Sequence, residues 1–263
     1  MSKGYLNEVL NGINDELLLP LIKKEESKLT YVLNRVDNNF NPNFSSIYKQ
    51  YDKGTVIKKV ENKTYLQKKL GLNVLKDAPL LCFVGRLSEQ KGISLLVEVL
   101  DVVFRNTNAQ FIQLGGGDSN YIPKLASLRH KYKKRVFIYG RSDFIITPQI
   151  YASSDICLVP SMFEPCGIVP MEAQIFGCVP IVNSTGGLND TVVDYAVNKK
   201  NATGFMFSNF DKDNFVFTLG RALDLFNNKQ EWNRLVQNAM SCDFSWDKSA
   251  SEYMKIYKGI LDL

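Results

Sequence analysis

The stretch "LLCFVGRLSEQKGISLLVEVLDVVF", residues 80–104, contains the three parts of one repeating structural unit. Its first residues, "LLCFV", form the continuous apolar run that is typical of a strand buried in a parallel sheet. After the polar loop "GRLSEQKG" comes a segment whose apolar residues recur at helical spacing: Ile93, Leu96, Val97, Leu100 and Phe104. This stretch therefore predicts a strand, a loop and an amphipathic helix, in that order.

The same alternation of short apolar runs and helical segments continues towards the C-terminus. Further apolar runs occupy residues 110–115, 135–140, 155–160, 179–184 and 204–209. Continuous apolar strands separated by helices indicate a parallel sheet that is covered on both faces. The sequence therefore predicts an α/β fold with a doubly wound, Rossmann-like parallel sheet, and residues 80–263 are assigned to this domain.

The residues before the sheet domain have a different character. They are rich in asparagine and lysine, as in "VDNNFNPNFSS" (36–46), and residues 34–79 are predicted to form a connecting region. The whole chain of 263 residues is 45% hydrophobic and 22% charged, which is typical of a soluble globular protein. Its net charge of +5 comes from scattered lysines and not from a basic stripe, so a nucleic acid is not an expected partner.

Cysteine and histidine usage argues against the usual metal-binding patterns. The five cysteines include no C-x-x-C pair and the chain has one histidine, so no metal site is predicted. Unpaired cysteines in this pattern are typical of a reducing compartment. No segment approaches the roughly 20 apolar residues of a membrane span, and the N-terminus lacks a signal pattern. The sequence therefore predicts a cytoplasmic protein with no membrane partner.

In doubly wound sheets, ligands bind at the carboxyl ends of the strands, where the strand-to-helix loops lie. The unusual residues of this chain fall in those loops: "RLSEQKG" (86–92), "GGGD" (115–118), "SMFEPCG" (161–167) and "STGG" (184–187). We therefore expect one crevice at this edge of the sheet to be the binding site.

Two of these loops have the chemistry of a phosphate site. Arg86 and Lys91, a planar fork and a point charge, suit a diphosphate whose oxygens point in several directions. The two glycines of "STGG" stand at an expected helix start, where backbone N–H groups favour an anion. Each of these loops, taken alone, has an equally good structural explanation. Solvated surface charge explains Arg86 and Lys91, and a plain structural turn explains the two glycines of "STGG". "LGGGD" lacks the full G-x-G-x-x-G spacing, so it predicts a tight turn and close backbone approach.

The segment "PSMFEPCGIVPMEAQIFG" (160–177) carries two carboxylates, Glu164 and Glu172. Gly167 is expected to turn the backbone into a helix whose first turn accommodates Pro170. Both carboxylates can then reach one crevice and accept hydrogen bonds from sugar hydroxyls. Paired carboxylates are also typical of glycoside hydrolases, but a hydrolase has no need of cationic and glycine-rich phosphate loops.

Taken in order, "GRLSEQKG", "LGGGD", "PSMFEPCG" and "STGGLNDTV" resemble the glycogen and starch synthase family, retaining glucosyltransferases of the two-domain GT-B fold. The resemblance extends to "KLTYVLNRVDNNFNP" (28–42), "ENKTYLQKKLGL" (61–72) and "DFSWDKSASEYMKIY" (243–257), and covers roughly residues 28 to 260. It implies that residues 80–263 are the C-terminal, nucleotide-sugar-binding domain of a GT-B fold.

The resemblance also implies roles for individual residues. Arg86 and Lys91 would grip the donor's diphosphate and Glu164 would lie at the transferred glucose, so these three are the candidate catalytic residues. Further donor contacts are implied for Gly85, Gly116, Asp118, Arg141, Cys166, Gly167, Glu172, Thr185, Gly186 and Gly187. The implied reaction moves glucose, with retention, from ADP-glucose or UDP-glucose to the non-reducing 4-hydroxyl of an α-1,4-glucan. No metal ion and no cofactor are expected.

Three positions depart from the family pattern. Arg35 stands where the family usually has the glycine of Asn-Gly-Ile-Asp, and "IITPQIYA" (145–152) lacks the usual His-Arg pair. Arg141 falls near the place where an aromatic residue often stacks on the base, so the donor's base is left open.

A whole half of the family pattern is also absent from this sequence. The N-terminal domain, with its Lys-x-Gly-Gly loop, is not present, and residues 1–33 resemble its tail. The closing helix around Trp246 to Tyr257 would cross back to that missing domain, which would leave apolar surface exposed. The chain is therefore expected to be the donor-binding half of a synthase. A stand-alone nucleotide-sugar-binding or regulatory module is the alternative; "FEPCG" and "FSW" argue against a sucrose-synthesising or mannosyl enzyme.

Overall fold

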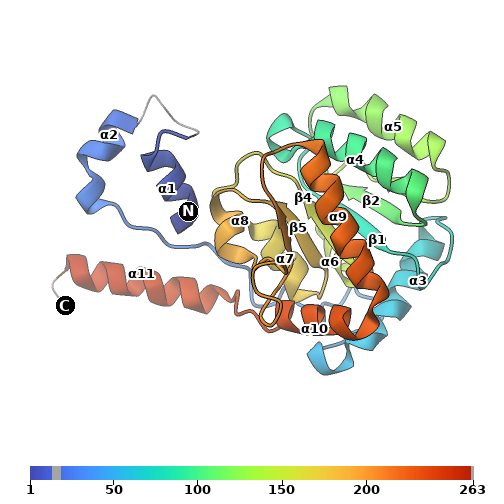
Figure 1. The fold of residues 1–263 in the computed structure, drawn as a ribbon. Helices are drawn as coiled ribbons and strands as arrows, with labels where there is room; N and C mark the ends of the chain where they lie inside the picture. The colour runs from blue at the N-terminus through green and yellow to red at the C-terminus, as the bar shows by residue number, and fades with distance from the viewer. Residues whose placement is uncertain (14–18, 262–263) are drawn as a thin grey trace.

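The computed structural model describes residues 1–13 and 19–261, and within them a single parallel sheet of six strands forms the centre of the protein (Figure 1). Its strands are β1 (Leu80–Val84), β2 (Gln110–Leu114), β3 (Val136–Ile138), β4 (Ile156–Val159), β5 (Val179–Asn183) and β6 (Phe205–Phe207). Their order is β3-β2-β1-β4-β5-β6, and each neighbouring pair is parallel. Every strand lies within one of the predicted apolar runs, so the predicted fold class is confirmed.

Helices cover both faces of the sheet because side chains alternate along each strand. Leu81 and Phe83 of β1 point into one apolar core, and Leu80 and Cys82 point into the other. The first core is closed by α4 (Ile93–Asn106), α5 (Ile122–Lys131), α9 (Lys212–Asn227) and α10 (Lys229–Ala239). The second is closed by α3 (Lys59–Lys69), α6 (Ile146–Ser153), α7 (Ile168–Ile175) and α8 (Gly186–Thr191).

The segment that we expected to be a connecting region also contributes to the second core. Phe40, Ile47, Tyr51 and Leu66 are buried there, although the local sequence is rich in polar residues. The hydroxyl of Tyr51 donates a hydrogen bond of 2.8 Å to the carbonyl oxygen of Phe176. The 3-10 helix η2 (Lys53–Lys58) leads directly into α3, so this segment is a covering layer of the sheet.

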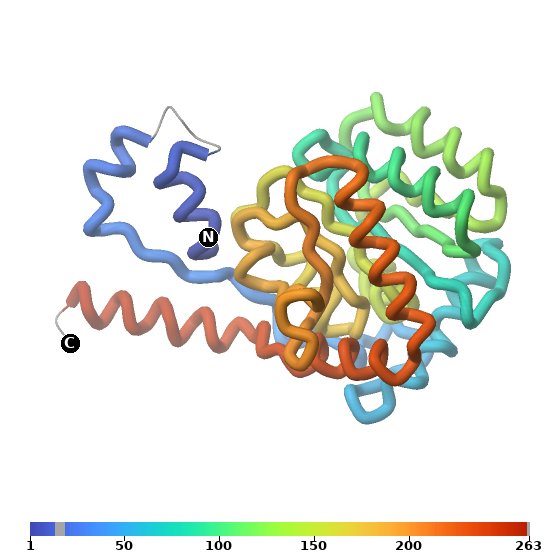
Figure 2. The backbone as a smooth tube through the Cα atoms, in the orientation of Figure 1, coloured from blue at the N-terminus to red at the C-terminus, as the bar shows by residue number. Residues whose placement is uncertain are grey.

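The two ends of the described chain form an arm beside the sheet (Figures 1 and 2). The arm comprises α1 (Lys3–Leu10), α2 (Leu19–Lys24), the 3-10 helix η1 (Glu26–Lys28) and α11 (Trp246–Ile260). Arg35 links the two parts of this arm. Its guanidinium donates hydrogen bonds to Glu252 at 3.0 Å and to Ser249 at 3.2 Å, and both of these residues belong to α11. Arg35, which departs from the expected pattern, therefore ties the incoming segment to the last helix.

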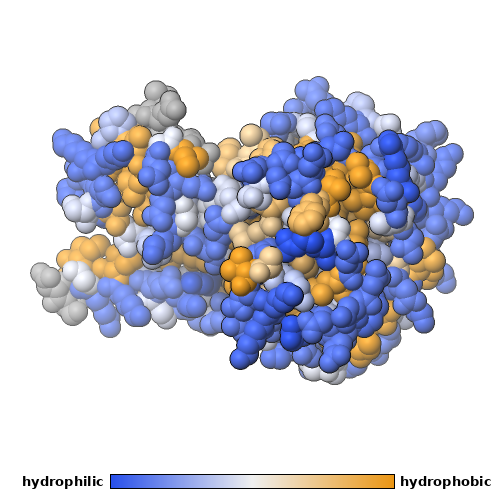
Figure 3. Space-filling model, in the orientation of Figure 1, coloured by the Kyte–Doolittle hydropathy of each residue, from blue (hydrophilic) through white to orange (hydrophobic). Residues whose placement is uncertain are grey.

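Apolar side chains are exposed along this arm (Figure 3). On α11 they are Trp246, Met254, Tyr257 and Ile260, and the N-terminal part adds Leu21, Leu29 and Tyr31. The exposed apolar side chains of α11 agree with the expectation that the helix around Trp246 to Tyr257 leaves apolar surface exposed. Within the described ranges, no helix has the length and apolar character to cross a membrane.

Candidate functional site

The four predicted loops meet at the carboxyl edge of the sheet, near the point where the strand order reverses between β1 and β4. Their backbones are hydrogen-bonded to one another and so form one continuous surface. The amides of Leu87, Met162 and Gly187 donate to the carbonyl oxygens of Gly116, Gln90 and Glu164 at 2.9, 2.8 and 2.7 Å. The structure therefore brings together the loops that the sequence singled out.

Two glycines make this close approach sterically feasible. Gly92 has a φ of 69°, and a Cβ there would lie 2.0 Å from the carbonyl oxygen of Pro160. Gly186 has a φ of 44°, and a Cβ there would lie 2.4 Å from the carbonyl oxygen of Glu164. Both the left-handed backbone and the contact exclude a side chain.

Lys91 and Glu164 form an ion pair at the centre of this surface. The ammonium lies 2.5 Å from the Glu164 Oε2 atom, and their side chains are only 17% and 14% exposed. Ser161 donates a second hydrogen bond to the same oxygen at 3.3 Å. Arg86 is exposed, with a weak contact of 3.5 Å to the Oε1 atom of Gln90. One cation of the predicted pair is thus held by the carboxylate, and the other reaches into solvent.

The predicted anion site at "STGG" is occupied by a carboxylate from the arm. The amide of Gly186 and the hydroxyl of Thr185 donate to the Oε1 atom of Glu8, at 2.6 and 3.0 Å. The amide of Gly187 faces the other way and donates to the Glu164 carbonyl oxygen at 2.7 Å. Sequence reasoning missed Glu8 because nothing in "YLNEVL" marks it; the docking of α1 on α8 brings it to this loop.

Glu172 lies deeper, in the first turns of α7. Its Oε2 atom accepts a hydrogen bond of 3.0 Å from the hydroxyl of Tyr151, which the sequence analysis had not singled out. Burial raises the pKa of the Glu172 carboxyl to about 7, and the Tyr151 hydrogen bond opposes this shift only in part. The side chain lines a cavity of about 220 Å³ together with Arg35, Phe40, Phe44 and Phe144. The two glutamates therefore contact different groups, Glu164 a cation and Glu172 a phenol.

Replacing Glu172 with glutamine is expected to change how stability depends on pH. The folded chain holds the Glu172 proton with a pKa of about 7, against 4.5 for the free side chain. A raised pKa means that the free energy of unfolding of the native protein falls as the pH rises from 4.5 to 7. Relative to the native protein, Glu172→Gln should gain up to about 3 kcal/mol across this window. Urea unfolding at several pH values measures the difference, and a pH-independent difference would contradict the assignment.

The remaining predicted residues are distributed around the same edge. Asp118 begins the 3-10 helix η4 (Ser119–Tyr121), and its carboxylate accepts the amide of Asn120 at 2.9 Å. Arg141 is exposed next to the glycine loop, since its carbonyl oxygen accepts the amide of Gly115 at 3.0 Å. Gly116 packs against the backbone of the same residue, since a Cβ atom on Gly116 would lie 3.7 Å from the Arg141 Cα atom.

Gly85, Cys166 and Gly167 are the other predicted residues of these loops. The amide of Gly85 donates to the Leu114 carbonyl oxygen at 3.0 Å, which extends the pairing of β1 with β2. Gly167, with a φ of 75°, precedes the first residue of α7, as the sequence predicts. Cys166 is partly buried beside it and is a free thiol. The 3-10 helix η3 (Glu89–Lys91) places Lys91 immediately before Gly92.

Comparisons with known proteins show which family the chain belongs to. Residues 66–240 match the family of glycosyl transferases group 1. The glycogen synthase of Fervidobacterium nodosum is 39% identical over 260 residues, which are 98% of this chain and 53% of that protein. The glycogen synthase of Bacillus cereus (strain ZK / E33L) is 38% identical over 264 residues, with 100% and 55% covered. The chain therefore spans about half the length of these curated relatives.

Solved structures show the same similarity. The catalytic domain of starch synthase IV from Arabidopsis thaliana, solved with ADP and acarbose, has a TM-score of 0.94 and 30% identity over 100% of this chain and 55% of that one. Sucrose-phosphate synthase from Thermosynechococcus elongatus shares the fold alone, with a TM-score of 0.60, 23% identity, and 77% and 49% covered. The chain thus belongs to the glycosyl transferases group 1, and within that family it belongs with the glycogen and starch synthases.

Proposed function

We propose that this chain is the donor-binding half of a retaining glucosyltransferase that extends an α-1,4-glucan from ADP-glucose or UDP-glucose. The observation that carries this proposal is the pairing of Lys91 with Glu164 at the edge where four loops converge. A cation and a carboxylate side by side match two adjacent parts of a nucleotide sugar, since the cation suits the diphosphate and the carboxylate suits the hydroxyls of the sugar attached to it. The starch synthase of similar fold was solved with ADP and acarbose bound.

In the proposed donor complex, the diphosphate lies between Arg86 and Lys91. Arg86 is exposed and free to turn towards a ligand, while Lys91 exchanges its contact with Glu164 for a phosphate oxygen. As the bond from the anomeric carbon to the phosphate breaks, negative charge gathers on the departing phosphate. Two cations in contact with the diphosphate stabilise this charge more in the transition state than in the ground state, which lowers the barrier.

The other loops would hold the sugar and nucleoside ends. Glu164, released from Lys91, accepts hydrogen bonds from the transferred glucose, and the amides of Cys166 and Gly167 line the same pocket. Glu172 lies at the ribose end of the donor. The donor replaces the Glu8 carboxylate at Thr185 and Gly186, because those two donors are already arranged for an anionic oxygen. Gly85, Gly116, Asp118 and Arg141 lie on the base side, and Gly187 supports the Glu164 loop.

A second, N-terminal domain would complete the site and supply the glucan surface. Two observations support this part of the proposal. Apolar side chains are exposed on the arm, and the chain covers only 53–55% of the length of the two glycogen synthases. Such a domain would bury these side chains, which a monomeric chain rarely leaves exposed in one patch.

Joining this chain to the N-terminal half of the Bacillus cereus glycogen synthase is expected to give glucosyl transfer, because the joined halves restore both walls of the cleft. Labelled ADP-glucose and UDP-glucose are supplied as donors with glycogen as acceptor, and incorporated label is counted. The chain alone should transfer almost nothing. Rapid transfer by the chain alone would contradict the need for a second domain. A folded hybrid that binds ADP but never transfers glucose would favour a stand-alone binding module.

A further inference from the structure

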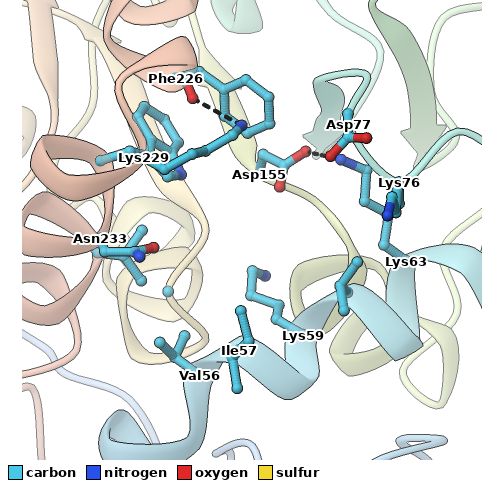
Figure 4. A pocket seen from close by; sticks show the side chains of 14 residues that line it. Val56, Ile57, Lys59, Lys63, Lys76, Asp77, Asp155, Phe226, Lys229 and Asn233 are labelled. Carbon is cyan, nitrogen blue, oxygen red and sulfur yellow. Dashed lines mark hydrogen bonds and ion pairs between the residues drawn. The ribbon is translucent and has the colours of Figure 1, made fainter.

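A second cavity lies at the opposite edge of the sheet from the donor loops. It opens at the amino ends of the strands, since Asp77 precedes β1 and Asp155 immediately precedes β4 (Figure 4). Its volume is about 310 Å³, at the lower end of the range for small-molecule sites, about 300–1,000 Å³. None of the residues that we assign to the donor lines it.

The lining of this cavity is rich in cations. Lys59, Lys63, Lys76 and Lys229 contribute four positive charges, against two negative charges from Asp77 and Asp155. Asp155 is already satisfied within the protein. Its Oδ2 atom accepts the ammonium of Lys63 at 2.6 Å and the amide of Leu80 at 2.8 Å. An excess of two positive charges therefore remains for a ligand.

Two of the lysines approach the cavity from different helices. The Lys59 ammonium, on α3, donates to the Tyr151 carbonyl oxygen at 2.5 Å. The Lys229 ammonium, on α10, donates to the Phe226 carbonyl oxygen at 2.9 Å, as Figure 4 shows. An ammonium has three N–H donors, so each side chain has further donors for a ligand. Burial lowers the pKa of Lys59, a cost that an anion in the cavity would offset.

The remaining wall of the cavity is mainly apolar. Phe226 and Trp232 contribute aromatic side chains that are largely buried, Val56, Ile57, Val60 and Val236 contribute aliphatic side chains, and Asn233 contributes a polar one. Ile57 and Val60 are exposed on this wall, and a free inorganic anion would leave them against water. A ligand with an apolar or ring-shaped body would cover them while its charge met the lysines.

We propose that this cavity binds a small phosphate-bearing molecule, with the phosphate dianion between Lys59 and Lys229 and an apolar or ring-shaped body against the apolar wall beside Trp232. Lysine binds phosphate as a point charge, and two lysines match the charge of the dianion. This site is separate from the donor loops, so its occupancy does not depend on the function proposed above.

The location of Trp232 provides a direct test with phenyl phosphate as the probe. The chain has two tryptophans, so in a Trp246→Phe background the fluorescence reports on Trp232 alone. Phenyl phosphate is expected to change this fluorescence saturably at concentrations below about 10 mM. Adding Lys59→Gln and Lys229→Gln should weaken binding by about tenfold or more, since both charge-assisted contacts are lost. The control pair Lys58→Gln and Lys133→Gln makes the same charge change outside the cavity and should leave the affinity unchanged.

Three results would overturn the proposal. The first is the absence of a saturable change, and the second is equal affinity in the Lys59→Gln/Lys229→Gln variant and its control. The third is equally tight binding of benzyl alcohol, which has the ring without the phosphate. Loss of binding in Arg86→Ala, with the cavity lysines having no effect, would place the phenyl phosphate at the donor loops instead. Circular dichroism confirms that each variant is folded.

Discussion

Replacing Lys91 with methionine is expected to lower the turnover of the joined, two-domain enzyme by about 10²–10³-fold. Lys91 is the better positioned of the two cations, because its ammonium is fixed 2.5 Å from Glu164 and is largely shielded from solvent. Shielding strengthens its interaction with charge that develops on the departing phosphate. Methionine retains the unbranched, flexible stem of the side chain and removes the ammonium group with its charge and hydrogen-bond donors.

Steady-state kinetics with labelled ADP-glucose separates this role from simple donor binding. A role in the transition state beyond donor binding predicts that kcat falls by a larger factor than KM rises. Lys91→Arg keeps the charge and should recover part of the rate, whereas Arg105→Met removes a cation of an exposed ion pair with Asp101 and should leave the rate unchanged. A raised KM with an unchanged kcat would show that Lys91 only holds the ground-state donor.

Replacing Lys63 with methionine is expected to lower the free energy of unfolding by about 3–5 kcal/mol. Lys63 is buried, with 3% of its side chain exposed, and its ammonium lies 2.6 Å from Asp155. Asp155 is itself only 15% exposed, and the same oxygen also accepts the amide that begins β1. Removal of the lysine leaves this carboxylate without its hydrogen-bonded cation, and a largely buried carboxylate that has lost its direct partner is costly.

A matched control shows whether burial of the ion pair causes the predicted loss in the free energy of unfolding. Lys131→Met removes the ammonium of a pair with Asp101 in which 50% and 26% of the side chains are exposed, and it should cost no more than about 1 kcal/mol. Urea unfolding followed by circular dichroism measures both variants. Equal losses for Lys63→Met and Lys131→Met would contradict the role of burial in the first pair.

The sheet and the convergence of the candidate loops at one of its edges could be predicted because they depend on local patterns. Each of the six apolar runs contains a strand, and the loops with unusual residues follow β1, β2, β4 and β5. Parallel strands bring their carboxyl ends to one edge, so loop position along the chain translates directly into position in space. Gly167 and Pro170 also predicted the start of α7 through backbone geometry alone.

The contacts that the sequence did not reveal join distant parts of the chain. Glu8 reaches Thr185 across 177 residues, and Arg35 reaches Glu252 across 217 residues. Tyr151 meets Glu172 only because α6 and α7 cover the same face of the sheet. Phe40 and Tyr51 lie among polar residues, and only tertiary packing shows that they are buried. Local composition carries no information about such partners.

Calorimetric titration of the chain with ADP tests most directly whether the loops at the carboxyl edge bind a nucleotide-sugar donor. ADP should bind, and Arg86→Ala and Lys91→Ala should each weaken the affinity by about tenfold or more, since each removes one charge-assisted contact to the diphosphate. The Lys59→Gln/Lys229→Gln variant, altered at the far edge, should bind ADP as the native chain does. Titration with UDP in parallel reports the base preference near Arg141. Unchanged ADP affinity in both Arg86→Ala and Lys91→Ala would contradict the donor-binding site.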